Sequence, residues 1–180
     1  MKKVLIIIGS DSDFPIIKDS LSILKRFGIE NETLVCSAHR TPETAAKISR
    51  DASEKGFGVI IAAAGLAAHL PGVIAAYTTL AVIGIPVSTG PLNGTDSLYS
   101  IVQMPSGVPV ATVAINGGTN AALLAVQILA VGSQELTERL IAYKADLRSS
   151  VERKNAFLED RKRKRLNSSH GTSARMPSSG

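Results

Sequence analysis

The chain has 180 residues, of which 44% are hydrophobic and 4% aromatic, and it contains no Trp. This length suits one domain, and a core of Ala, Val, Ile and Leu is typical of packed strands and helices. The scarcity of aromatic side chains argues against the stacking platforms of proteins that bind single-stranded nucleic acid.

The formal net charge of +5 comes almost entirely from the C-terminal end. Residues 158–180 hold six Lys or Arg and two acidic residues, which leaves 14 basic and 13 acidic residues in the rest of the chain. Binding of nucleic acid needs a basic face on the folded body. We therefore expect no nucleic-acid partner.

The cysteine content and the lengths of the apolar runs indicate the cellular compartment. Cys36 is the single cysteine, which excludes an intrachain disulfide. No window reaches the roughly 18 apolar residues of a membrane span, and the apolar run after Lys3 is too short for a signal peptide. We expect a cytoplasmic protein with no membrane partner.

Strand and helix signals alternate along the chain. Continuous apolar runs predict buried strands at 4–8, 33–36, 59–63, 81–87 and 108–114. Apolar residues at helical spacing, bounded by Pro or Gly, predict helices at about 15–27, 42–55, 71–77, 120–131 and 134–158. This alternation predicts an α/β fold, a three-layer sandwich around a central parallel five-stranded flavodoxin-like sheet, with the strand order taken from fold analogy.

The composition changes abruptly after Glu159. A block of five like charges at 161–165 is followed by a Ser- and Gly-rich end without periodicity. We expect a folded domain over 1–158, including the last helix, and a disordered basic tail over 159–180. A nucleic-acid-binding arm is the alternative, and the composition is also typical of ends that do not belong to a natural protein.

Three polar or small-residue loops follow the predicted strands at 10–13, 37–41 and 64–70. Open α/β sheets bind ligands beyond the carboxyl ends of their strands, where such loops meet. The first loop places Ser10, Ser12 and Asp13 before a helix, which suits an anion. The alternative is that Ser12 and Asp13 only cap that helix.

The other two loops each carry one histidine. His39 stands beside Arg40, whose forked donors suit phosphate, and a His can exchange a proton near neutral pH or serve only as a structural residue. Small residues surround His69 and let a ligand approach the backbone closely. No carboxylate or thiol spacing supplies a third ligand for a metal held by the two histidines, so we expect no metal.

Four motifs closely resemble the PurE family, and specifically its N5-carboxyaminoimidazole ribonucleotide mutase branch. They are Gly9-Ser10-x-Ser12-Asp13, Ser37-Ala38-His39-Arg40-Thr41-Pro42, the stretch 64–72 and the stretch 96–105. The resemblance covers residues 4 to about 155. It implies a cofactor-free isomerase of de novo purine biosynthesis that forms an octamer with its sites between subunits, and that receives its nucleotide from an ATP-dependent carboxyaminoimidazole ribonucleotide synthase.

The resemblance also implies residue roles. Binding of ribose and phosphate would fall to Ser10, Asp13 and Arg40, with Ser37 nearby. His39 would transfer the proton. The pocket for the imidazole and the migrating carboxylate would be lined by Gly65, His69 and Leu70, and the loop 93–100 with the Met104-Pro105 turn would close or buttress the site. The chain departs from many relatives at Ala63 and Leu66, where they have Gly.

Three rival functions fit the sequence less well. A sister branch carboxylates the ribonucleotide directly, with Lys in place of Arg40 and Ser-Asn in place of the Ala67-Ala68-His69 stretch, and this chain follows the mutase at both places. An electron carrier with a flavin needs aromatic residues at the strand ends, where this chain has almost none. An assembly subunit without catalysis would have no use for the His39-Arg40 pair.

Overall fold

The computed structural model describes residues 2–171, with side chains described for residues 2–166. It divides into two compact units, one ending at Thr137 and the other beginning at Glu138. Among the described residues, no helix combines the length and the apolar character needed to cross a membrane.

The first unit is built on five parallel strands in the order β2-β1-β3-β4-β5. They are β1 (Lys3–Ile8), β2 (Asn31–Val35), β3 (Phe57–Gly65), β4 (Ala81–Val87) and β5 (Ala111–Thr112). At the end of β1, Ile8 lies opposite Val35 on one side and Ala63 on the other. The carboxyl ends of these three strands therefore meet at one edge, in the predicted flavodoxin-like arrangement.

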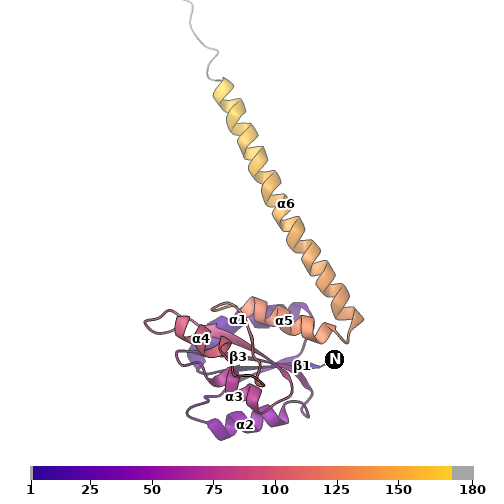
Figure 1. The fold of residues 1–180 in the computed structure, drawn as a ribbon. Helices are drawn as coiled ribbons and strands as arrows, with labels where there is room; N and C mark the ends of the chain where they lie inside the picture. The colour runs from indigo at the N-terminus through magenta and orange to yellow at the C-terminus, as the bar shows by residue number, and fades with distance from the viewer. Residues whose placement is uncertain (1, 172–180) are drawn as a thin grey trace, which may run out of the picture. The chain divides into compact units, whose positions relative to one another are not determined.

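Helices cover both faces of the sheet, which confirms the predicted three layers (Figure 1). On one face α1 (Phe14–Arg26) packs on α5 (Gly118–Ala130), where the Ser20 hydroxyl donates to the Gly118 carbonyl at 2.7 Å. The other face carries α2 (Pro42–Asp51) and α3 (Leu70–Ala76). Alternate side chains of the buried strands reach the two faces, so Leu5 and Ile7 share a core with Ile74 of α3.

One helix was not predicted. Residues 93–100 were expected to form a loop, but α4 spans Thr95–Val102. Gly94 turns the chain with φ 87°, and the Ser97 hydroxyl contacts the carbonyl oxygens of Gly94 and Val87 at 2.9 and 3.0 Å. Ile101 is fully buried. Tertiary packing thus stabilises a helix too short to be evident from its own pattern.

The fifth strand is shorter than the predicted 108–114, since β5 pairs with β4 only at Ala111 and Thr112. Pro109 has no amide hydrogen to donate, so the ladder cannot extend toward its N-terminal side. Beyond the strand, the Val113 amide still donates to the Gly84 carbonyl at 3.2 Å.

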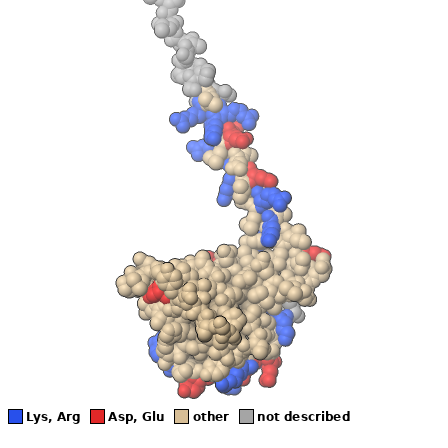
Figure 2. Space-filling model, in the orientation of Figure 1, with Lys and Arg blue, Asp and Glu red and all other residues tan. Residues whose placement is uncertain are grey.

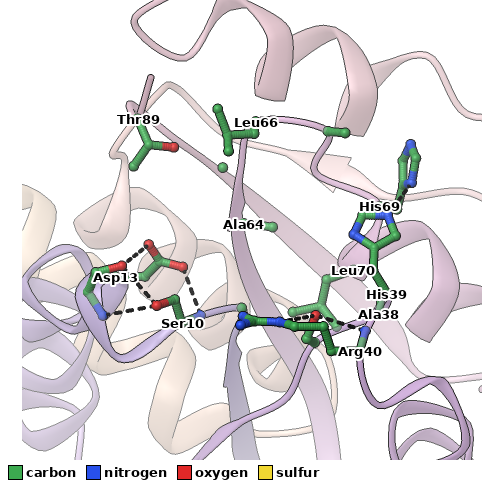
Figure 3. Close-up of a pocket in the computed structure, with 15 residues that line it drawn as sticks. Ser10, Asp13, Ala38, His39, Arg40, Ala64, Leu66, His69, Leu70 and Thr89 are labelled. Atoms are coloured by element: carbon green, nitrogen blue, oxygen red, sulfur yellow. Dashed lines mark hydrogen bonds between the residues drawn. The ribbon is translucent and has the colours of Figure 1, made fainter. Parts of the chain in front are cut away.

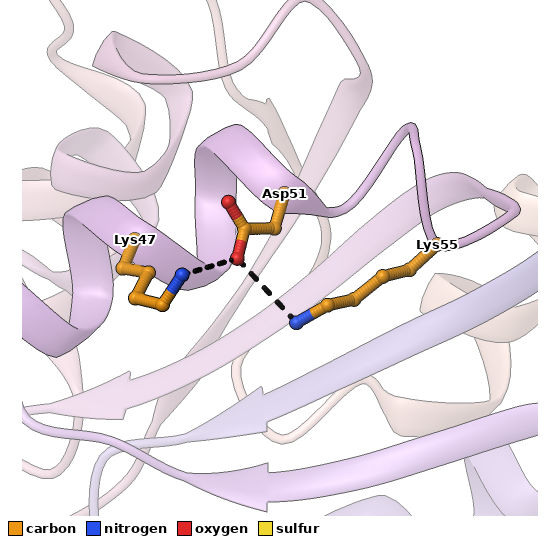
Figure 4. Close-up of polar contacts among 3 residues, drawn as sticks. All are labelled: Lys47, Asp51 and Lys55. Atoms are coloured by element: carbon orange, nitrogen blue, oxygen red, sulfur yellow. Dashed lines mark hydrogen bonds and ion pairs between the residues drawn. The ribbon is translucent and has the colours of Figure 1, made fainter.

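The end of α2 is held by exposed ion pairs (Figure 4). The carboxylate of Asp51 lies 2.8 Å from the Lys47 ammonium and 3.6 Å from that of Lys55. The hydrogen bond from Lys47 is the main reason that the pKa of Asp51 is lowered. The helix was predicted to continue to Lys55, but it ends at Asp51 and the chain turns through Gly56 at φ 87°.

The last helix, α6, spans Gln134–Gly171 and so continues beyond residue 158, where it was expected to end. Residues 159–170 contain no Gly or Pro and are rich in good helix formers. Within them, Lys164 pairs with Asp160 at 2.8 Å, and Figure 2 shows Lys and Arg gathered toward the end of this helix. Of the predicted disordered tail over 159–180, residues 159–171 belong to α6, and residues 172–180 lie outside the described residues. The predicted domain limit at 158 stays a prediction.

Candidate active site

A cavity of about 560 Å³ lies at the carboxyl edge of the sheet (Figure 3). Its lining comes from the loops that follow β1, β2, β3 and β4 and from the start of α3. The structure brings all eight predicted site residues together in this lining: Ser10, Asp13, Ser37, His39, Arg40, Gly65, His69 and Leu70. The roles expected of them stay predictions.

The first loop is closed by a capping box. It forms a short 3-10 turn (Asp11–Asp13), whose N-cap hydroxyl, that of Ser10, accepts from the Ser12 amide at 3.4 Å. The Asp13 carboxylate in turn accepts from the Ser10 amide at 3.2 Å. The alternative, in which Ser12 and Asp13 only cap α1, is not what the structure shows: Asp13 stands at the N-cap position of α1 but makes no side-chain cap hydrogen bond there.

Asp13 is the buried carboxylate of the site. Its side chain is only 4% exposed, and burial raises the pKa of Asp13, with the hydrogen bonds from Ser10 and Ser12 acting in the opposite direction. A buried carboxylate that is held in place by the backbone is a well-positioned acceptor for a ligand hydroxyl.

The second loop presents Arg40. The Ser37 hydroxyl accepts from the Arg40 amide at 3.2 Å and from its side-chain Nε at 3.4 Å. Thr41 closes the turn, because its hydroxyl donates to the Ser37 carbonyl at 3.0 Å. Among the described residues, Arg40 forms no ion pair. Its guanidinium is exposed, and it also lines an adjoining hollow of about 400 Å³. The group is therefore oriented and available to an anion.

The two predicted histidines are in direct contact, which the sequence did not indicate. Nε2 of His39 lies 2.7 Å from Nδ1 of His69, and the ring planes meet at 72°. One of these nitrogens must donate and the other accept, so the pair holds the two rings in complementary tautomers. The nitrogens outside this contact are Nδ1 of His39 and Nε2 of His69.

The third side of the cavity is apolar and tightly built. A Cβ added to Gly65 would collide with the hydroxyl of Thr89, which also lines the cavity. Sequence reasoning missed Thr89, although its position directly after β4 was a usable signal. Leu66 adopts φ 54°, a left-handed conformation that costs a residue with a side chain roughly 1–2 kcal/mol.

The segment expected to close or buttress the site lies outside the cavity lining of this chain. Residues 93–105 contribute none of the lining residues. Met104 instead lies close over Gly72 of α3, where a Cβ would come within 3.0 Å of its sulfur and 2.9 Å of its methyl group. It therefore packs behind the helix that follows His69. Among the side chains that are described, no three of His, Cys, Asp or Glu gather as a metal site would require.

A parallel α/β sheet whose carboxyl edge holds an imidazole pair and an exposed guanidinium in one cavity is typical of an enzyme of the flavodoxin-like class. Residues 3–150 match the family described as AIR carboxylase, and the chain belongs to this family, that of the PurE enzymes.

Relatives and solved structures agree with this assignment. A Pyrococcus horikoshii protein named N5-carboxyaminoimidazole ribonucleotide mutase is 54% identical over 155 residues, which cover 86% of this chain and 88% of that protein. A Thermotoga maritima protein of the same name is 52% identical over 159 residues, or 88% and 93% of the two chains. The crystal structure of Treponema denticola PurE matches with a TM-score of 0.73 at 30% identity, covering 82% of this chain and 92% of that one.

Proposed function

We propose that the chain is an N5-carboxyaminoimidazole ribonucleotide mutase of de novo purine biosynthesis. It would convert that substrate into 4-carboxy-5-aminoimidazole ribonucleotide, moving one carboxylate from a nitrogen to a ring carbon. The observation that carries the proposal is that the paired imidazoles of His39 and His69 share one cavity with the oriented guanidinium of Arg40. The names of the relatives support the same reaction.

The polar side of the cavity would bind the nucleotide. Arg40 makes no ion pair among the described residues, so its forked donors can take the phosphate together with the hydroxyl of Ser10. The carboxylate of Asp13 would accept from a ribose hydroxyl. Ser37 would act through Arg40, because its hydroxyl contacts both the backbone and the side chain of that residue.

The imidazole of His39 would move the proton. Protonated His39 gives its proton to the carbamate nitrogen, the N–C bond breaks with its electron pair left on nitrogen, and CO₂ is released. The ring carbon then attacks CO₂ to form the C–C bond, and neutral His39 takes the ring proton. One proton is given and one regained, so the step is a true isomerisation. Contact with His69 would keep His39 in a single tautomer and orientation.

The carbon dioxide would be held by the apolar side of the cavity, which includes Ala64, Gly65 and Leu70. Bicarbonate is a hydrated anion that would lose its solvation on entering such a pocket, whereas neutral CO₂ would not. The site would therefore favour a carboxylated amine as substrate over the bare aminoimidazole ribonucleotide with bicarbonate. We propose that the reaction needs no cofactor.

The proposal extends to assembly and cellular context. Leu92, Tyr99 and Val102 are 59%, 61% and 48% exposed, and Figure 2 shows much of the visible face of the first unit free of charge. Apolar surface of this kind is typical of subunit interfaces. The enzyme would be a cytoplasmic octamer with a catalytic domain over 1–158, and it would take its substrate from the ATP-dependent synthase. Light scattering that finds a monomer at micromolar concentrations would contradict the assembly.

A labelling experiment tests the reaction. The N-carboxylated nucleotide carries ¹³C in its carbamate, and the full-length protein converts it in excess unlabelled bicarbonate. We expect most of the label on the ring carbon of the product. Complete washout of the label, together with efficient use of the bare nucleotide and CO₂, would assign the chain to the carboxylase branch.

A further inference from the structure

We propose that Leu66 is a retention residue, whose side chain closes the apolar end of the cavity and keeps CO₂ inside between its release and its recapture. The inference rests on the proposed function, because it requires free CO₂ as an intermediate. It assigns a role in specificity to a residue that lines the cavity in a left-handed backbone conformation.

The backbone at Leu66 identifies the position as unusual. Its φ of 54° is one of three positive values among the non-glycine residues described, and the other two belong to asparagines, which tolerate this conformation. The chain turns here between β3 and α3, and the Ala68 amide donates to the Leu66 carbonyl at 2.8 Å. Glycine would make the same turn without strain. Leucine differs from glycine here only by its side chain. Backbone strain that persists at the edge of a site indicates a functional role for that residue.

The side chain bridges two loops. A Cβ placed on Gly90, which follows β4 with φ 72°, would lie 2.6 Å from Cδ2 of Leu66. The leucine therefore lies directly on Gly90 and joins the loop after β3 to the loop after β4. In Figure 3 Leu66 lies beside Thr89 at one end of the cavity, away from Ser10 and Arg40. The closed end is thus the end away from the proposed phosphate contacts.

The chemistry of the intermediate explains why an apolar closure matters. Free CO₂ has no charge by which Arg40 could hold it, so only the walls of the cavity keep it near the ring carbon. If the cavity is open, CO₂ diffuses out into the unlabelled pool and the label is lost with it. Removing the four carbons of the Leu66 side chain would open the wall between the two loops at Gly90.

The test compares Leu66→Gly with the unchanged full-length protein in the ¹³C experiment, measuring the labelled fraction of the product and the KM for the nucleotide. We expect the ratio of retained to lost label to fall severalfold, with KM nearly unchanged and the melting temperature unchanged or raised. Val131→Gly is the matched control. It removes a branched side chain that is 91% exposed and outside the cavity lining, so label retention should stay at the wild-type level.

Two outcomes separate this inference from the proposed function. If the wild-type protein retains the label and Leu66→Gly retains it equally, Leu66 has no retention role and the mutase proposal stands. If the wild-type protein does not convert the labelled nucleotide at all, the proposed function has failed. Should Leu66→Gly not fold, Leu66→Asn gives the same test, because asparagine tolerates a positive φ but offers a polar wall. A wild-type labelled fraction in that variant would likewise overturn the inference.

Discussion

Asp13 and Asp51 are two aspartates of the same unit in opposite situations. Asp51 is partly exposed at the end of α2, where the hydrogen bond from Lys47 and the charges of Lys47 and Lys55 lower its pKa. Asp13 is buried at the cavity, and burial raises its pKa. The end of α2 is arranged to favour the charge, whereas the site carries a carboxylate where its charge is disfavoured. We infer from this difference that the environment of Asp51 contributes to stability, whereas that of Asp13 costs stability, as is typical of a functional position.

The largest effect should come from His39→Gln, which changes function at the site without changing the fold. Glutamine keeps a hydrogen bond but cannot cycle a proton, so kcat should fall by about 10²–10⁴. Nucleotide affinity and melting temperature should stay close to wild type, because the side chain is exposed. Steady-state kinetics with a binding titration measures both. Near-normal turnover would refute the role that we assign to His39.

Arg40→Ala should instead act on binding. Loss of a charge-assisted hydrogen bond should weaken nucleotide affinity by roughly 1.5–3 kcal/mol. Arg50→Ala is the control, since the Arg50 guanidinium lies 4.6 Å from the ring centre of Tyr77 and outside the cavity lining. Isothermal titration of both variants checks the difference. Equal losses of affinity would show that the guanidinium of Arg40 has no special role.

Asp13→Asn should separate stability from binding. The unfolded carboxyl titrates near its usual 3.8 and the folded one higher, so the folded state binds more protons between these values and wild-type stability falls as the pH rises through that window. The stability of the asparagine variant should not show this decrease with pH, because asparagine does not titrate. At neutral pH it should equal or exceed wild-type stability by about 1 kcal/mol or less, yet bind nucleotide more weakly. Denaturant unfolding of both proteins at several acidic pH values measures this difference in pH dependence. A variant clearly less stable than wild type at neutral pH would contradict the prediction.

Asp51→Asn should have the smallest effect and the opposite pH dependence. The pKa of Asp51 is lower in the folded state than in the unfolded state. The ionised carboxylate therefore stabilises the fold above pH 3.8, and this stabilisation is lost as the pH falls through the lower, folded pKa. The exposed pairs with Lys47 and Lys55 are screened by salt. The melting temperature should therefore drop slightly at low salt and hardly at all in molar salt, with unchanged turnover. A salt-independent loss would show that the carboxylate has another structural role.

Much of the first unit was predictable because its signals are local. Continuous apolar runs identified β1, β3 and β4. The rule that parallel strands present their loops at one edge brought His39 and His69 into one cavity. The contact between their rings was not predictable, since it depends on the register of β1 with β2 and β3. The helix after Gly94 was missed because its stability comes from the burial of Ile101 rather than from its own eight residues.

The register at Ile8 has a consequence for how the protein folds. Two of the loops that line the cavity follow β2 and β3, the strands paired directly with β1, and a slip of one residue would turn the following side chains to the other face. A partly folded chain, with β3 or β4 undocked, therefore has no complete cavity. Nucleotide binding should be coupled to the complete fold, and a ligand at one hundred times its Kd would stabilise that state by about 2.7 kcal/mol. In a cell, substrate supply would then affect how long each copy survives, as well as how fast it works.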